Sequence, residues 1–401
     1  MEQKKVFLIG SNLAAGGIET AFLHFVSNMR DSVDLDVFLC SNSGVLKDNM
    51  PKDVCVYEGN KILRNTNRAD SIDSSANTED GAPARLGAKA RLVNFIKRAL
   101  DKLHVDKHRI VVGVQSVGVN LLKKPKKQYD VAICFCAQHL CCENIALKRV
   151  NAKEKWAVIH ADVRQVNYSK KLIKTLAKFD KILCVSSSCA EIFKGVYPHL
   201  KDKVDYIYNF QDNKKIVEKS KEFTVQYPIT FNMVSVARLF EQDKGIIRFA
   251  DVLKRLHDEG YDFCYHVIGG GIDEQKMKDH VKKIGAEDYI LFYGQKANPY
   301  PFVKKADLLV LCSYHESWGL VVAEALTLGT PVLSTKTSSS EELIADYGTV
   351  CENSSDGLYS SLKDILDGKI DLKTQRENLK NYTYDNKKIK DKVLYLLENV
   401  K

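Results

Sequence analysis

The sequence predicts an α/β protein with two parallel-sheet halves of similar size. The chain has 401 residues, of which 45% are hydrophobic and 28% are charged, ordinary values for a globular protein long enough for two or three domains. Short apolar runs that read as strands alternate with helical patterns, as in a doubly wound parallel sheet. This alternation begins again near residue 230, behind the Lys- and Glu-rich segment 212–225.

The first half carries five strand candidates and two clear helical patterns. The strand candidates are 4–10, 33–40, 131–136, 156–159 and 182–185. Apolar residues recur at helical spacing in 17–29 and 170–179. We expect a first domain over 1–210.

The second half repeats this order. Its strand candidates are 230–236, 263–268, 289–293, 308–311 and 331–334, and its helical patterns include 245–256 and 319–328. We expect a second domain over 211–385. The charged, helical end of the chain, with a last helix over 386–401, is expected to pack back on the first domain.

Composition excludes several protein classes. The eleven cysteines are an odd number, and several lie in apolar runs, which favours buried free thiols over a disulfide framework or a zinc site. The chain has neither a signal-peptide pattern at its start nor a membrane-length apolar run. We therefore expect a cytoplasmic protein.

The whole chain has a net charge of +9, and one segment is much more basic than the rest. Residues 85–127 contain twelve Lys and Arg against two Asp, and apolar residues recur at helical spacing from Val93 to Leu103. The segment is either a solvated surface helix or a peripheral contact with anionic lipid on the inner face of the plasma membrane. Nucleic acid is not expected, because no aromatic-rich platform accompanies the charge.

The stretch SVARLFEQDKG places Arg238 and Lys244 around a turn between a strand and a helix. Two cations at the end of a parallel strand suit a diphosphate, and the helix N-terminus adds its own positive end. Each could also be an ordinary surface charge.

The stretch CSYHESWGLVVAEALTLGT holds two carboxylates eight residues apart, Glu316 and Glu324. A helix that begins near Gly319 would leave the N–H groups of Gly319, Leu320 and Val321 free for phosphate or sugar oxygens. Carboxylates beside a diphosphate suit the hydroxyl groups of a sugar and a ribose.

Together, the R-x5-K pair, the E-x7-E pair and the following Gly-Thr-Pro-Val resemble the donor-binding half of a family 4 glycosyltransferase. The resemblance spans about residues 233–351 and implies two Rossmann-like domains that face each other across a cleft, the GT-B architecture. It implies that Arg238 and Lys244 bind the nucleotide diphosphate and that Glu316 and Glu324 bind the donor sugar and the ribose, respectively.

In the first half, the resemblance rests mainly on AGGIE, residues 15–19. It places Gly16 and Gly17 at the diphosphate or acceptor, the backbone near Gly294 at the base, and His160 near the reaction centre. A structural role for His160 stays open.

The sequence departs from the family pattern at two places. Ser317 follows the first glutamate where the family commonly has Gly, and Ser338-Ser339-Ser340 replaces a Gly-rich turn ahead of Glu341 and Glu342. Two other signals are weak. The D-x-D of Asp34–Asp36 lies in a strand without a diphosphate site beside it, and Gly269–Gly271 lacks the G-x-G-x-x-G spacing.

The resemblance implies a retaining, metal-independent glycosyltransferase without a cofactor. Its substrates would be a nucleotide sugar, UDP-linked in our interpretation, and a glycan or lipid-linked glycan of cell-surface polysaccharide assembly. Three alternatives stay open: a sugar-nucleotide epimerase of the same fold, a non-catalytic sugar-nucleotide or lipid-binding protein, and a nucleotide-dependent oxidoreductase.

Overall fold

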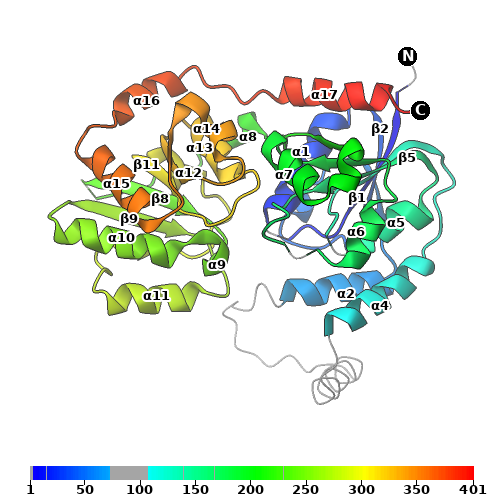
Figure 1. Ribbon diagram of the computed structural model, residues 1–401, viewed down its shortest axis with the longest axis horizontal. Coiled ribbons are helices and arrows are strands. Elements are labelled where there is room, and N and C mark those ends of the chain that lie inside the picture. Colours follow the sequence, from blue (N-terminus) through cyan, green and yellow to red (C-terminus); the bar gives the residue numbers. More distant parts are fainter. Residues whose placement is uncertain (1–2, 15, 73–106, 139, 167, 229) are drawn as a thin grey trace.

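A computed structural model describes residues 3–14, 16–72, 107–138, 140–166, 168–228 and 230–401. It contains two parallel sheets, each flanked by helices (Figure 1). The predicted helical pattern 93–103 and about half of the basic segment 85–127 lie outside the described residues.

The first sheet has seven strands in the order β3-β2-β1-β4-β5-β6-β7, all parallel. Their bounds are β1 Lys5–Gly10, β2 Asp34–Leu39, β3 Cys55–Glu58, β4 Tyr129–Cys134, β5 Ala152–Ile159, β6 Lys181–Cys184 and β7 Val204–Tyr206. The helices around it are α1 Gly17–Met29, α2 Lys61–Ile72, α4 Lys107–Asn120, α5 Cys141–Arg149, α6 Lys170–Leu176 and α7 Ser187–Val196.

The second sheet has six parallel strands in the order β10-β9-β8-β11-β12-β13. Their bounds are β8 Phe231–Val236, β9 Phe263–Ile268, β10 Ile290–Phe292, β11 Leu308–Leu311, β12 Val332–Thr335 and β13 Thr349–Cys351. Its helices are α9 Glu241–Lys244, α10 Ile246–Asp258, α11 Glu274–Lys283, α12 Tyr300–Lys305, α13 Leu320–Thr327, α14 Ser340–Ile344, α15 Ser355–Leu366 and α16 Leu372–Leu379.

The sequence pattern did not predict three of the strands, and all three lie at sheet edges. β3, β7 and β13 are three or four residues long, and most of their residues are at least partly exposed. An edge strand has one neighbour and one open side, so it lacks the continuous apolar run of a central parallel strand.

The segment between the two sheets is more ordered than a linker. It contains α8, Asn213–Lys219, whose N-terminus is capped by the Asp212 side chain and whose Ile216 is buried. α8 packs against α12 and α13 of the second domain. Its single buried apolar residue explains why composition alone suggests a connector.

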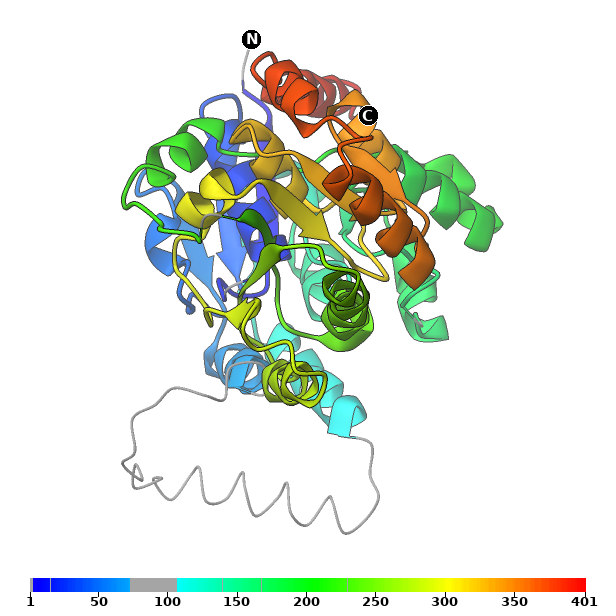
Figure 2. The same ribbon diagram turned by 90° about the vertical axis from the view of Figure 1, so that its left-hand side faces the viewer.

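The last helix, α17 (Asn386–Glu398), returns to the first domain and packs against α1. Lys392 forms an ion pair of 3.0 Å with Asp205, and Asn386 accepts a hydrogen bond from the Gln211 amide. Figures 1 and 2 both place α17 at the opposite end of the molecule from α2 and α4.

The cysteines are free thiols, and nine of the eleven are buried. Cys40 lies 3.7 Å from Cys141 and 3.9 Å from Cys142, measured between sulfur atoms. Burial and these neighbours raise the pKa of the Cys40 thiol, so it stays protonated.

Glu342 joins the two domains directly. Its carboxylate, from α14, accepts hydrogen bonds from the backbone and side chain of Ser187 at 3.2 and 2.8 Å and from those of Ser188 at 3.3 and 3.0 Å. The Tyr208 hydroxyl donates another. These serines begin α7, where the helix dipole favours a negative charge.

We expect Glu342→Gln to destabilise the protein by about 1–3 kcal/mol at pH 7, because charge-assisted hydrogen bonds are lost. Burial opposes ionisation of Glu342, but hydrogen bonds from Tyr208 and Ser187 outweigh it and lower its pKa from 4.5. A lowered pKa stabilises the folded state above the unfolded value, so the difference from wild type should shrink as the pH falls below about 4.5. Urea unfolding at pH 7 and under acid conditions measures this.

Glu341→Gln is the matched control, because the Glu341 carboxylate is exposed and pairs with the exposed Lys336. It should change stability by less than about 0.5 kcal/mol. Equal stability of both variants at pH 7 would contradict the proposed importance of the Glu342 contact.

Candidate functional site

The candidate site is built on the loops that follow the carboxyl ends of β8, β9 and β11. The loop after β8 carries Arg238, which is exposed, and α9 then ends at Lys244. Gly245 adopts a φ of +63°, and an added Cβ would lie 2.5 Å from the Cys312 carbonyl oxygen. A glycine here therefore lets the Lys244 turn approach the loop after β11.

The Gly269–Gly271 run packs closely against the backbone of the Arg238 loop. An added Cβ at Gly269 would lie 1.8 Å from the Ala237 carbonyl oxygen, and one at Gly271 would lie 2.3 Å from the Leu239 carbonyl oxygen. Gly269 also donates its N–H to the Gly294 carbonyl oxygen at 3.0 Å. The run is thus explained by close backbone packing, and it ties the predicted Gly294 to the Arg238 loop.

Lys244 and Glu316 meet directly. The Lys244 Nζ lies 2.8 Å from Glu316 Oε2, and each side chain is 20% exposed. Two backbone contacts hold the loops together: the Tyr314 amide donates to Asp243, and the Cys312 thiol donates to the Lys244 carbonyl oxygen. The pair is fixed on both sides before any ligand binds.

Helix α13 begins beside this pair. Gly319 precedes the helix with a φ of +77°, in the left-handed region that favours glycine. Within the described part of the chain, no hydrogen bond uses the N–H groups of Gly319, Leu320 or Val321. These donors and the positive end of the helix dipole remain available to an anion.

The first domain brings its glycine turn to the same place. An added Cβ at Gly17 would lie 4.0 Å from Leu320 of the second domain, and one at Gly16 would lie 2.3 Å from the Glu19 carboxylate. Burial raises the pKa of Glu19, while Arg238 opposes that shift by favouring the ionised form. Glu19 of the first domain and Arg238 of the second are therefore close enough for their charges to attract each other.

Glu324 lies on α13, further along the helix than the three residues with free N–H groups. The Tyr300 hydroxyl donates to its carboxylate at 3.2 Å. Burial raises the pKa of Glu324 to about 7, against a small opposing effect of that hydrogen bond. A carboxylate held there without a cation is poorly satisfied, and ligand hydroxyl groups would supply the missing donors.

His160 directly follows β5 in the first domain. Its ring centroid lies 4.8 Å from that of Phe135, which packs against Phe22 and Phe25 of α1. Burial lowers the pKa of His160 to about 4, with a backbone hydrogen bond to Phe135 opposing the shift, so the ring is neutral at pH 7. Its Nε2 is buried and has no partner among the described residues.

The two serines that depart from the family pattern make contacts to the first domain. Ser317 Oγ accepts the Asp162 amide at 2.9 Å, and its carbonyl oxygen accepts from Ser186 at 3.4 Å. Ser338 Oγ donates to the Glu316 carbonyl oxygen at 2.7 Å and lies 3.6 Å from the Cys189 sulfur. The Asp162 carboxylate itself pairs with Arg164.

The structure therefore joins some predicted residues and separates others. It pairs Lys244 with Glu316 and sets Gly17 against Leu320. No hydrogen bond or ion pair in the described ranges links His160 or Glu324 to that pair. Sequence reasoning gave no role to Glu19 or Tyr300, since neither belongs to the motif pairs that drew attention.

The two carboxylates of the D-x-D motif already have partners within the protein. Asp34 and Asp36 pair with Lys127 Nζ at 2.7 and 3.0 Å, and the Tyr129 hydroxyl donates to Asp36 at 2.7 Å. In the ranges that the structure describes, no cluster of three or more His, Cys, Asp or Glu is arranged to hold a metal ion.

Comparison with known protein families identifies the second domain. Residues 217–386 match the family "Glycosyl transferases group 1". That range contains Arg238, Lys244, Glu316 and Glu324. The candidate site is therefore built mainly from the part of the chain that matches this family.

Curated relatives are distant. N-acetyl-alpha-D-glucosaminyl L-malate synthase of Bacillus anthracis is 26% identical over 54% of this chain and 60% of its own length. Lipopolysaccharide 1,6-galactosyltransferase of Escherichia coli is 25% identical over 54% of this chain and 59% of its own length. The matches span about half the length of the first relatives.

Solved structures match the whole chain. HepE of Anabaena, in complex with UDP and glucose, superposes with a TM-score of 0.65 at 16% identity, covering 99% of this chain and 100% of that one. The galactosyltransferase WaaB gives a TM-score of 0.61 at 17% identity, with coverage of 98 and 99%. The predicted fold class, two Rossmann-like domains in the GT-B arrangement, is confirmed.

We expect Glu324 to make stability pH-dependent near neutrality. Its folded pKa of about 7 lies above the ordinary 4.5, so the folded state binds the extra proton between these values. Stability then falls as the pH rises through this window, by about 1–2 kcal/mol given the partial exposure of the residue. Glu324→Gln should lack this loss in thermal unfolding between pH 5 and 8. An unchanged pH profile would contradict the raised pKa.

Proposed function

We propose that this protein is a retaining, metal-independent glycosyltransferase of family 4 type. It would transfer a hexosyl group from a nucleotide sugar, UDP-linked, to a glycan or lipid-linked glycan in cell-surface polysaccharide assembly. The observation that carries the proposal is the Lys244–Glu316 pair, held beside the free N–H groups of α13 and opposite the glycine turn of the first domain.

The charges suit a donor diphosphate. A lysine ammonium group has three donors, so Lys244 can keep Glu316 and still contact a phosphate oxygen. Arg238 is exposed and able to reach a second phosphate, and the α13 N-terminus adds its dipole. These groups supply positive charge where a leaving nucleotide develops negative charge.

The carboxylates suit the neutral parts of the donor. Glu316, fixed by Lys244, would accept hydrogen bonds from sugar hydroxyls, and Glu324 would accept them from the ribose. Several similar structures contain the same type of ligand: HepE has been solved with UDP, with UDP and glucose, and with UDP-glucose. This supports UDP over other nucleotides as the first choice.

The reaction we propose takes place on one face of the sugar. The acceptor oxygen attacks the anomeric carbon as the bond to the diphosphate oxygen breaks, and that oxygen takes the acceptor proton. Arg238, Lys244 and the α13 amides stabilise the departing diphosphate. Neutral His160, whose Nε2 is unpartnered, would donate or accept one hydrogen bond at the sugar without changing charge.

The acceptor class rests on relatives. The matched proteins include lipopolysaccharide 1,6-galactosyltransferases and the lipopolysaccharide glucosyltransferase WaaG of Escherichia coli. Their names support assembly of a surface glycan. Among the described residues, none of the helices is both long and apolar enough to cross a bilayer.

We expect Arg238→Ala and Lys244→Ala each to lower kcat/KM for transfer by about 10²–10³-fold, because each removes a preorganised charge from the leaving group. Lys254→Ala, at a half-buried α10 position where the lysine pairs with Asp258, is the control and should leave kcat/KM unchanged. Steady-state kinetics and thermal unfolding test this. Near-wild-type turnover in either site variant would overturn the assignment.

We expect UDP-sugars, rather than GDP- or dTDP-sugars, to stabilise the protein, by about 2.7 kcal/mol at 100 times the dissociation constant. EDTA should leave the transfer rate unchanged, since side chains supply the positive charge. Complete loss of activity in EDTA would contradict metal independence. Turnover of the donor sugar into its epimer without acceptor would favour the epimerase.

A further inference from the structure

One side of the first domain is unusually basic. Helices α4, α5 and α6 cover the same face of the first sheet, with buried side chains of all three in one apolar cluster. Residues 107–128 and 168–178 contain no Asp or Glu, and the one acidic residue of α5, Glu143, is fully buried. We call this surface the α4–α6 face.

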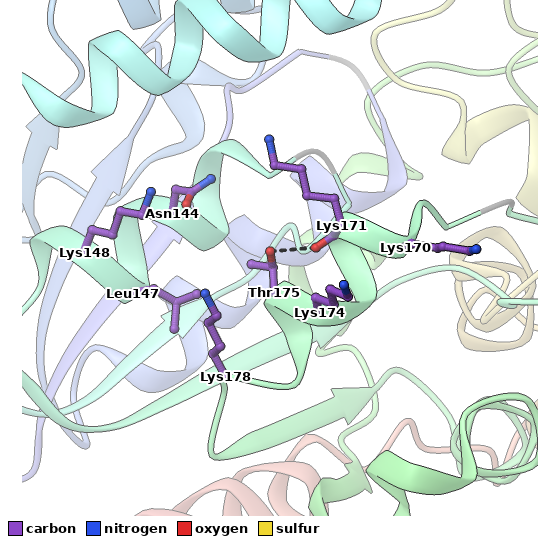
Figure 3. A pocket seen from close by; sticks show the side chains of 8 residues that line it. All are labelled: Asn144, Leu147, Lys148, Lys170, Lys171, Lys174, Thr175 and Lys178. Carbon is purple, nitrogen blue, oxygen red and sulfur yellow. Dashed lines mark hydrogen bonds between the residues drawn. The ribbon is translucent and has the colours of Figure 1, made fainter.

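An open groove lies on this face between α5 and α6. It measures about 720 Å³, and five of its eight lining residues are lysines (Figure 3). The lining residues are Asn144, Leu147, Lys148, Lys170, Lys171, Lys174, Thr175 and Lys178. All five lysines are exposed, and none of their amino groups has an acidic or hydrogen-bonding partner in the described ranges.

The arrangement of these lysines is locally unfavourable. Lys170 and Lys174 lie four residues apart on α6, where like charges repel, and Lys178 follows just after the end of the helix. Lys170 and Lys171 also stand in the first turn of α6, against the positive end of the helix dipole. A ligand that carries several negative charges would relieve both effects.

An exposed apolar stripe accompanies the charge. Val114, Val117 and Leu121 are 42, 53 and 65% exposed, and their spacing of three and four residues places them on one side of α4 and its end. α4 packs against α5, one wall of the groove. Four lysines follow the stripe at 123, 124, 126 and 127.

The stripe and the groove are connected through Lys155. Its Nζ donates to the carbonyl oxygen of Leu147, a groove residue, at 2.9 Å. Burial lowers the pKa of Lys155, and the nearby charge of Lys124 lowers it further against the opposing effect of Asp180. Lys124 is thus close enough to the edge of the groove to act on Lys155, whereas Lys127 is paired with Asp34 and Asp36.

We propose that the α4–α6 face docks on a bilayer that contains anionic phospholipids. The groove lysines would contact lipid phosphates, and Val114, Val117 and Leu121 would enter the boundary between head groups and acyl chains. A nucleic acid or an acidic polymer would use the lysines but not the apolar stripe, and so a lipid surface is the occupant that both features favour. The docking needs no nucleotide sugar and stands apart from the proposed transfer reaction.

The test is flotation of the full chain with vesicles of equimolar phosphatidylcholine and phosphatidylglycerol, and with vesicles of phosphatidylcholine alone. The groove variant combines Lys171→Gln, Lys174→Gln and Lys178→Gln. Its matched control combines Lys276→Gln, Lys282→Gln and Lys283→Gln, three exposed lysines of α11 in the second domain. Both variants lose the same net charge.

We expect wild type and control to float with the anionic vesicles only. The groove variant should bind about 100-fold more weakly, which corresponds to ~1 kcal/mol per lysine near an anionic surface. Raising the salt concentration should reduce this difference, since exposed charges are screened. A second variant, Val117→Ser with Leu121→Ser, should bind more weakly at every salt concentration.

Three results would overturn the proposal: equal flotation of the groove variant and its control, equal binding to both kinds of vesicle, or no binding by wild type. Thermal unfolding shows whether each variant is folded, and the groove variant should be at least as stable as wild type, because its substituted side chains are exposed and their mutual repulsion is removed. If the groove variant floats normally but its KM for acceptor rises, the groove binds the acceptor and the lipid assignment is wrong. If the transfer assay fails, the proposed function is contradicted, but the flotation result still tests the lipid surface.

Discussion

The site depends on a set of hydrogen bonds that hold the two domains against each other. Glu342 accepts donors from the start of α7, and Ser317 accepts the Asp162 amide. Ser317 follows Glu316 in sequence, so the contact also fixes the loop that carries the Lys244 partner. One interface contact is therefore made by the residue next to Glu316, which we propose binds the donor, and we expect movement of the domains to move this loop.

This arrangement explains why the site balances its charges in pairs. Lys244 is matched by Glu316, and Arg238 acts on Glu19 from across the boundary. Cations that line a cleft without acidic partners would repel one another. Paired charges can be held close together and can reorient when a diphosphate binds. Glu324 is the exception. Among the residues that the structure describes, Tyr300 alone donates to it, and burial raises its pKa to about 7. Polar groups of this kind carry a cost that a bound hydroxyl-rich ligand can remove.

The amino-acid sequence predicted the central strands and the motif pairs because each is a local signal. β11 is a continuous apolar run, β8 and α13 are mostly apolar, and Lys244 and Glu316 are recognised by their spacing from Arg238 and Glu324. The edge strands and the partners of Glu324 and Arg238 depend on contacts between distant segments, which no local pattern encodes. Ser317 and Ser338 illustrate the difference. In sequence they look like departures from a family pattern, and in the structure they bond across the interface.

One loop links the proposed lipid surface to the proposed reaction centre. Asp162 contacts the second domain, and Ser169, which follows it in the sequence, caps α6 and its first groove lysines. A bilayer on the α4–α6 face would therefore lie one loop away from the cleft, on the domain that must supply the acceptor site. A lipid-linked acceptor could keep its anchor in the bilayer while its glycan end reaches the cleft. This geometry joins the two proposals, although each is tested separately: vesicle binding reports the surface, and donor turnover reports the cleft.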